Sequence, residues 1–287
     1  MKAVFKLPDE TFLEIISYFP VISFRYSIDT NLKSVWYPTH LPGEYAERSN
    51  VLRAITQTCR TLRRKFLSWS WERVEACVAP DPTAWYIQLG NSLESKCHIL
   101  LKNPLLATYV RSASPRFPCS TLFSCVIIDS VMSVGITRYR MDAILPSFAN
   151  CLQSLPNLQT LELSHVHQGM TTKVKKAFEG VAIPSIRTVV LPTVAHHILR
   201  SCPNVEDVTC TDEDGSRLLG TIASNCPKVE RISGMVLSPV MLKSWSDSQL
   251  FAEPSLLIAR LPGLAKTNPN IRELSFFIVR RSCSVPH

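Results

Sequence analysis

The feature that most constrains the fold is a short phrase that occurs five times in the second half of the chain. Each copy fits Pro-x-Φ-x-x-Φ-x-Φ, where Φ is an apolar residue, except that Gly234 takes the last apolar place of the fourth copy. The copies are PNLQTLEL at 156–163, PSIRTVVL at 184–191, PNVEDVTC at 203–210, PKVERISG at 227–234 and PNIRELSF at 269–276. Proline ends a preceding helix and favours extended backbone at the residue before it, so each unit is predicted to be a helical segment followed by a short strand.

Units that recur 19 to 42 residues apart cannot bury their apolar faces alone, so neighbouring units are expected to stack. The spacing of Leu158, Leu161 and Leu163 resembles that of a leucine-rich repeat. The resemblance implies an irregular solenoid of helix–strand units, an α/β architecture, over residues 80–287. Three residues after the third apolar position, where the usual repeat has Asn or Cys, this chain has Val166, Val194, Glu213, Leu237 and Val279. An α/β layer with proline-terminated helices therefore remains the alternative.

The first twenty residues contain a complete helix signal, KLPDETFLEIISYFP at 6–20. Pro8 suits the first helical position, and Asp9 and Glu10 favour the positive end of the helix dipole. Apolar residues recur at helical spacing and form one stripe, and Pro20 closes the helix. The stripe consists of Phe12, Ile15, Ile16 and Phe19.

A second helical block is predicted over 49–78, with Ser49 or Asn50 as its cap. Its apolar stripe consists of Leu52, Ile55, Cys59, Leu62 and Phe66. A third short helix is expected after Trp69 and Trp71, and Pro80 and Pro82 mark a boundary. The polar stretch 21–46 between the two blocks is expected to be a loop or an insertion. Further on, a helix is predicted near 85–108 and a buried strand at 122–131.

Both N-terminal blocks resemble the F-box. The phrase LPDETFLEIISYF is similar to the first F-box helix, with Leu7, Pro8, Glu10, Ile15, Ile16 and Phe19 at matching positions. The phrase LRAITQTCRTLRRKFLSWSWERV is similar to the remaining helices, and Trp71 lies near the place of the terminal tryptophan. The second phrase is particularly similar to the expanded F-box families of mushroom-forming fungi. The resemblance implies an all-α F-box module at 1–79 with an insertion at about 21–48.

The resemblance also implies a function. F-box proteins dock onto the Skp adaptor of a cullin–RING ubiquitin ligase, and the repeat domain binds a protein substrate. The chain itself would then be non-catalytic. The basic cluster Arg60–Lys65 would suit an acidic adaptor surface. The adaptor-binding residues implied are Leu7, Pro8, Glu10, Phe12, Ile15, Ile16, Phe19, Leu52, Ile55, Cys59, Leu62 and Trp71. Two other functions remain open: a repeat scaffold without a ligase, and an intracellular nucleic-acid-binding protein.

Charge and cysteine content limit the possible partners and cellular location of the protein. The formal net charge is +8, but the basic residues form small separate clusters without interleaved aromatic residues, which disfavours nucleic acid. No apolar run reaches the length of a membrane span, so no membrane partner is expected. The ten cysteines are spread along a chain without a signal-peptide core, because Lys2 and Lys6 interrupt it. These features indicate a cytoplasmic or nuclear protein.

No motif predicts a metal, a cofactor or a catalytic nucleophile. No Cys-x-x-Cys, Gly-x-Ser-x-Gly or glycine-rich phosphate loop occurs. His165 with His167 and His196 with His197 are pairs without the paired cysteines of a zinc site. Cys202 and Cys226 each precede a repeat proline, which indicates a structural role. The acidic phrase TDEDGS at 211–216 is expected to be a solvated turn, or alternatively part of a binding rim.

Overall fold

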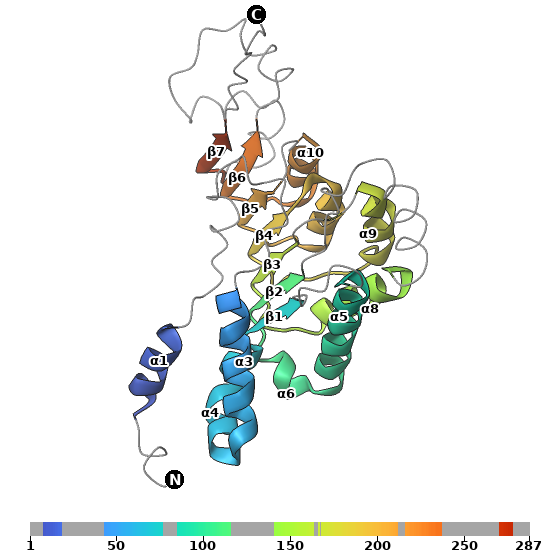
Figure 1. Ribbon diagram of the computed structural model, residues 1–287. Helices are drawn as coiled ribbons and strands as arrows, with labels where there is room; N and C mark the ends of the chain where they lie inside the picture. The colour runs from blue at the N-terminus through green and yellow to red at the C-terminus, as the bar shows by residue number, and fades with distance from the viewer. Residues whose placement is uncertain are drawn as a thin grey trace, which may run out of the picture. The chain divides into compact units, whose positions relative to one another are not determined.

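A computed structural model of the chain describes residues 8–18, 43–76, 85–115, 141–163, 166, 168–211, 216–236 and 270–277 (Figure 1). Contacts divide the chain into two compact units, Met1–Leu158 and Gln159–His287. The boundary predicted at 79/80 falls among residues 77–84, which lie outside the described ranges, as does the strand predicted at 122–131.

The first unit contains mainly helices. Its elements are α1 (Asp9–Ser17), α3 (Gly43–Thr58), α4 (Arg60–Trp71), β1 (Arg73–Ala76), α5 (Trp85–Lys102), α6 (Pro104–Ala107), β2 (Ser112–Pro115) and α8 (Met141–Gln153). The helix predicted at 6–20 is confirmed as α1, and the one predicted at 85–108 is confirmed as α5 followed by α6.

The block predicted to begin at Ser49 or Asn50 differs from the prediction. Helix α3 begins at Gly43, so both expected caps lie inside a helix, and residues 43–48 are helix rather than insertion. The chain breaks at Cys59, where α3 gives way to α4. After Trp71 it forms strand β1 instead of a third helix. The β-branched Val74, 6 % exposed, suits a strand that pairs in parallel with β2.

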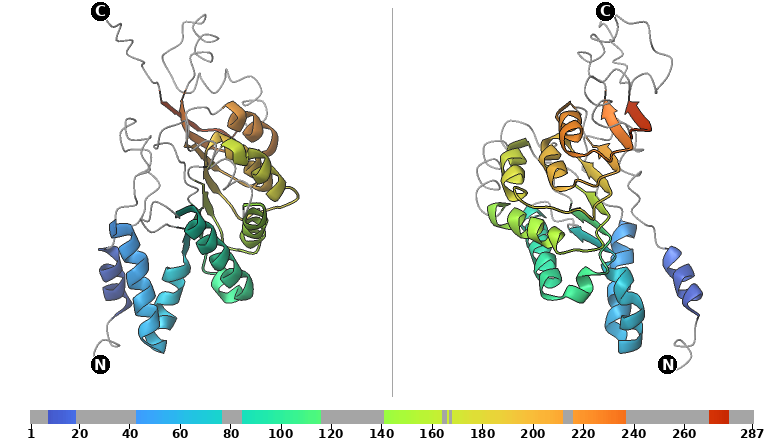
Figure 2. Two further views of the ribbon diagram at one scale, coloured as in Figure 1. Left: turned by 45° about the vertical axis from the view of Figure 1, so that its right-hand side comes forward. Right: turned by 180° about the vertical axis from the view of Figure 1, so that it is seen from behind.

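The second unit alternates strands and helices. Its elements are β3 (Thr160–Glu162), η2 (Gln168–Met170), α9 (Thr171–Ala177), β4 (Thr188–Leu191), η3 (Thr193–Ser201), β5 (Asp207–Cys210), α10 (Ser216–Asn225), β6 (Arg231–Val236) and β7 (Glu273–Phe277). Strands β3 to β7 pair in parallel in chain order. Helices α9 and α10 lie on the same side of these strands (Figure 2), and the 3-10 helix η3 packs against both. The α/β class predicted for this region is confirmed.

Each of the five phrases forms a strand, as predicted. Every strand begins four residues after its proline, and the five first residues pair directly across neighbouring strands. These residues are Thr160, Thr188, Asp207, Arg231 and Glu273. The phrase therefore sets strand register as well as strand position. Its third residue anchors the turn before the strand: Ile186, Val205 and Val229 are fully buried.

Strands β4 and β5 are buried on both faces. Val189 and Val208 are at most 1 % exposed, and the alternating residues Val190 and Thr209 are 1 % and 5 % exposed. Since successive side chains point to opposite faces, neither side of these strands is open to solvent. Burial on both faces is characteristic of parallel sheets.

The irregular fourth copy has a structural reason. Gly234 adopts a φ of 77°, and the pairing of β6 with β7 shifts between Ile232 and Met235, so that β6 carries a bulge. A Cβ at position 234 would lie 2.1 Å from the carbonyl oxygen of Cys210. Glycine is required there because only it tolerates both the backbone conformation and the close approach. Met235, 2 % exposed, takes the next inward place.

Residues 108–115, TYVRSASP, form a turn and strand of the same kind as the five copies of the phrase. Strand β2 begins four residues after Thr108, and Val110 and Ala113 are at most 1 % exposed. The amide of Asn157 donates to the carbonyl of Thr108 at 2.6 Å. Asn204 donates in the same way to Pro184, and Asn270 to Pro227. This unit has threonine in place of proline, so the proline-based pattern did not identify it.

Candidate docking surface of the N-terminal helices

Helices α1, α3 and α4 share one small core. Phe12 of α1, Leu52 of α3 and Phe66 of α4 are 7 %, 4 % and 1 % exposed, and they cluster together. The partly buried side chains of Ile55, Leu62 and Trp69 pack against this cluster. A nine-residue helix is marginal alone in water, so α1 owes its stability to this contact.

Aromatic rings set the geometry of the core. The Phe12 and Phe66 rings meet edge to face, with centroids 5.2 Å apart and an interplanar angle of 88°. Phe66 and Trp69 repeat this arrangement at 5.1 Å and 87°. The Nζ atom of Lys65 lies 5.1 Å from the centroid of the Phe12 ring. The cation over the ring adds an electrostatic attraction between α4 and α1.

Cys59 terminates α3 and starts α4. Its backbone is extended, with φ −158° and ψ 165°, and its Sγ accepts a hydrogen bond from the Leu62 N–H at 3.5 Å. Its carbonyl accepts the first intrahelical bond, from the Arg63 N–H at 2.9 Å. Cysteine here replaces the usual serine or threonine cap. The cysteine of the F-box-like phrase TCRTLRR thus has a local structural role.

The solvent side of the same helices is strongly charged. Glu10 and Glu14 are exposed on α1, and Tyr18 just after it is 79 % exposed. The exposed side chains of α3 and α4 include four arginines: Arg53, Arg60, Arg63 and Arg64. A basic surface of this kind attracts an acidic partner and accelerates its association.

The twelve predicted adaptor-binding residues divide into four groups. Phe12 and Leu52 are buried inside the module, and Ile55 and Leu62 pack against them, so these four stabilise the helices. Cys59 is the helix cap. Pro8 and Glu10 are exposed, while Trp71 is half-buried and lines a cavity. Ile15 and Ile16 lie in α1, but their side chains, like the residues Leu7 and Phe19, lie outside what the structure describes.

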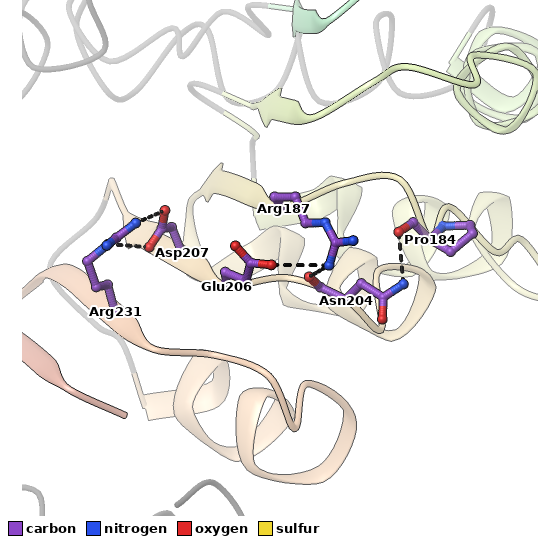
Figure 3. A network of polar contacts seen from close by, with 6 residues as sticks. All are labelled: Pro184, Arg187, Asn204, Glu206, Asp207 and Arg231. Carbon is purple, nitrogen blue, oxygen red and sulfur yellow. Dashed lines mark hydrogen bonds and ion pairs between the residues drawn. The ribbon is translucent and has the colours of Figure 1, made fainter. Parts of the chain in front are cut away.

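A row of exposed ion pairs lies at the starts of strands β4 to β7. Charged residues at the fourth and fifth places of the phrase pair with the neighbouring unit (Figure 3). Arg187 and Glu206 lie 3.1 Å apart, Asp207 and Arg231 2.5 Å, and Glu230 and Arg272 3.9 Å. No role was predicted for these charges, although opposite charges at the same place of two successive copies, as at Arg187 and Glu206, are visible in the sequence.

Exposed ion pairs contribute little to stability, about 0–1 kcal/mol each. The row of pairs therefore acts mainly on which copy of the phrase packs beside which. Arg187 also donates to the carbonyl of Asn204 at 3.2 Å, which fixes its guanidinium between two units (Figure 3). The six side chains of the three pairs remain 24 % to 78 % exposed. They form the charged solvent edge of the repeats.

The predicted structural role of Cys202 and Cys226 is confirmed. Both are fully buried, and the Cys226 thiol donates to the carbonyl of Leu199 at 3.5 Å. Burial raises the pKa of Cys226 to about 12, and it raises the pKa of Cys202 as well. Thiols held in the protonated form are poor nucleophiles.

Two further pairs of titratable residues are buried or half-buried. The thiol of Cys97 in α5 donates to Cys151 in α8, which raises the pKa of Cys97 and lowers that of Cys151. The rings of His196 and His197 lie 3.9 Å apart, and Nδ1 of His196 is 2.7 Å from the Thr193 carbonyl oxygen. His165 and His167 lie outside the described residues.

Within the described part of the chain, no three or more His, Cys, Asp or Glu side chains come together as a metal site would need. Among the same residues no helix combines the length and apolar character required to cross a bilayer. No protein-family model matches the sequence, and no curated protein matches it either.

Proposed function

We propose that this protein is a non-catalytic substrate-recognition subunit of a Skp–cullin–F-box ubiquitin ligase. In this proposal the helices α1, α3 and α4 dock onto the Skp adaptor, and the repeats bind a protein substrate. The observation that carries the proposal is the shared core of Phe12, Leu52 and Phe66. It joins the two separate segments that resemble the F-box into one helical module.

The charge of the module supports an acidic partner. Arg60, Arg63 and Arg64 are exposed on one helix and Arg53 on the helix beside it. An acidic adaptor would meet these arginines at the rim of an interface. Rim charges act mainly on the association rate and on the dependence of binding on salt.

The repeats support a protein-binding role through their regular stacking. Parallel pairing with the phrase in register is what a leucine-rich-repeat-like array requires. Because β4 and β5 are buried on both faces, we propose that the substrate contacts the charged residues at the starts of the strands. The charged side chains of Arg187, Glu206, Asp207 and Arg231 lie there.

The burial of Phe12 and Leu52 favours a second function, a repeat scaffold without a ligase. Among the described side chains of α1, α3 and α4, and of the turn that follows α1, Tyr18 is the large exposed hydrophobic residue. A docking helix normally presents several apolar anchors to its partner. The scaffold interpretation requires no apolar anchors on these helices.

Co-purification of the full chain with a recombinant Skp adaptor tests the proposal. Wild type is expected to bind, and the double variant Ile15→Asp, Phe19→Asp to lose binding, because a buried unpaired charge costs about 2–5 kcal/mol. Arg60→Glu with Arg64→Glu should slow association and reduce its salt dependence. Circular dichroism of each variant controls for loss of the helices.

Failure of the folded wild-type protein to bind the adaptor would overturn the ligase proposal in favour of the scaffold. Binding of duplex DNA or RNA with a steep salt dependence would instead support a nucleic-acid function, since released counterions produce that slope.

A further inference from the structure

A cavity of about 450 Å³ lies within the first unit, lined by residues of α3, α4, β1 and α5. Its size falls in the range of small-molecule sites, about 300–1,000 Å³. Its walls come from the three consecutive elements α3, α4 and β1 and from α5 further along the chain, so the cavity exists only in the folded unit. The F-box resemblance and the proposed ligase function do not account for it.

The lining is cationic. Arg53 of α3, Arg63 of α4, Arg73 of β1 and Lys96 of α5 all contribute to it, and the described lining residues include no Asp or Glu. Arg73 and Lys96 also interact with other groups of the chain. The positive charge of a partly enclosed cavity is screened less than that of an open surface, so the cavity favours an anion.

The other lining residues include hydroxyl-bearing and apolar side chains. Ser92 and Ser95 can donate hydrogen bonds to oxyanions, whereas the Ser70 hydroxyl donates to the carbonyl of Leu67 at 3.2 Å. Leu67, Trp71 and Ile99 supply apolar surface. Arginine side chains with hydroxyl donors match the tetrahedral oxygens of a phosphoryl group, and the guanidinium binds such groups in a bidentate manner.

We propose that this cavity binds a small phosphate ester. The four cations and the hydroxyls of Ser92 and Ser95 hold its phosphoryl group, and the apolar walls contact its organic body. Free inorganic phosphate shares the phosphoryl chemistry but lacks the organic body, so the two ligands are distinguishable by affinity. This proposal does not rest on adaptor docking, although Arg53 and Arg63 belong both to the cavity lining and to the basic surface of the helices.

Isothermal titration of the full chain in physiological salt tests the proposal with three probes: adenosine monophosphate, inorganic phosphate and adenosine. Adenosine monophosphate is expected to bind most tightly, inorganic phosphate more weakly, and uncharged adenosine not measurably. Bound ligand should also raise the melting temperature in a concentration-dependent way, because it binds the folded state alone.

The variant Arg53→Gln, Arg63→Gln removes two cations that line the cavity and are exposed to solvent. This variant should lower the affinity for adenosine monophosphate at least about tenfold, since charge-assisted hydrogen bonds are lost. The control Arg60→Gln, Arg64→Gln removes an equal charge from α4, at exposed positions outside the cavity lining. It should change the affinity by less than about twofold, as expected of distant screened charges.

A separate variant tests whether the apolar walls contact the organic body of the ligand. Ile99→Ser replaces an apolar wall residue, 37 % exposed. It should lower the affinity for adenosine monophosphate and leave the affinity for inorganic phosphate unchanged. Equal affinity for the two phosphates would overturn the ester assignment. Absence of binding at millimolar probe, or equal losses in the cavity and control double variants, would overturn the site itself.

Discussion

The ring of Phe12 meets the ring of Phe66 edge-on, with 5.2 Å between their centroids, and this contact attaches α1 to α4. The two residues are far apart in the sequence, and the stretch 19–42 between them lies outside the described residues. The contact therefore brings together the two segments that resemble the F-box. It also explains why the apolar stripe of α1 is not entirely available to a partner.

Phe66→Ala is expected to destabilise the helical module by about 3–5 kcal/mol, the usual cost of truncating a buried phenylalanine. Phe66 is 1 % exposed and contacts both Phe12 and Trp69, so its loss removes both aromatic contacts. Urea unfolding measures the change. Tyr18→Ala is the matched control, because Tyr18 is 79 % exposed and its truncation should cost less than about 0.5 kcal/mol. Equal losses in the two variants would contradict the core described above.

Substitutions at Cys59 test the helix cap. Cys59→Ser should be as stable as wild type or slightly more stable, because serine is a preferred cap and keeps an acceptor for the Leu62 N–H. Cys59→Ala should cost about 1 kcal/mol, the typical loss of a capping side chain. Thermal melting of both variants checks the order. A serine variant as unstable as the alanine variant would show that packing of the sulfur, rather than capping, matters at this position.

Three glycines give a graded test of backbone strain. Gly234→Ala should be the most destabilising substitution, because Gly234 combines a φ of 77° with a clash against the Cys210 carbonyl. Gly180→Ala should cost about 1 kcal/mol, since its φ is 76° but nothing lies within 4 Å of the added Cβ. Gly220→Ala, in open space inside α10, should stabilise by about 0.5–1 kcal/mol.

Differential scanning calorimetry of the three variants measures this order. An unchanged melting temperature for Gly234→Ala would mean that β6 does not carry the bulge.

His197 makes stability depend on pH. Burial, together with the nearby charges of His196, Arg200, Lys175 and Arg217, lowers the pKa of His197 to about 4. The unfolded chain protonates this histidine near its ordinary pKa of about 6.5, so between these values the unfolded state binds more protons. The contribution to stability is complete above about pH 6.5 and declines as the pH falls towards 4.

His197→Gln should flatten the acid limb of a plot of unfolding midpoint against pH. At pH 7.5, where the histidine is neutral in both states, the two proteins should differ only through packing. Parallel acid limbs for wild type and variant would contradict the lowered pKa.

Local sequence patterns predicted the positions of elements well. The proline of each phrase, followed by apolar residues at the third and sixth places, predicted all five strands from β3 to β7. The charged and apolar residues around Phe12 predicted α1. These predictions depend on interactions within a few residues, and such interactions are present in the sequence itself.

The missed elements lacked a local signal or had one that pointed elsewhere. Helix α3 begins at Gly43, and the expected caps Ser49 and Asn50 lie inside it. Its extent reflects packing on α4 rather than a local cap signal. The unit at 108–115 has Thr108 where the other units have proline. Its sequence signal was the pair Val110 and Ala113 at the spacing of the phrase. The asparagine after the proline in three of the five copies was a second unused signal, since its amide bonds the preceding unit.

The sequence by itself determined where strands begin, how they are spaced and which helix carries an apolar stripe, because backbone preferences of proline and side-chain periodicity are local. Only the tertiary structure decided which of those apolar residues face inward, as Phe12 and Leu52 do. It also brought Arg53, Arg63, Arg73 and Lys96 around one cavity. Burial and convergence of charges depend on contacts between segments distant in the chain, and a single sequence carries no direct record of such contacts.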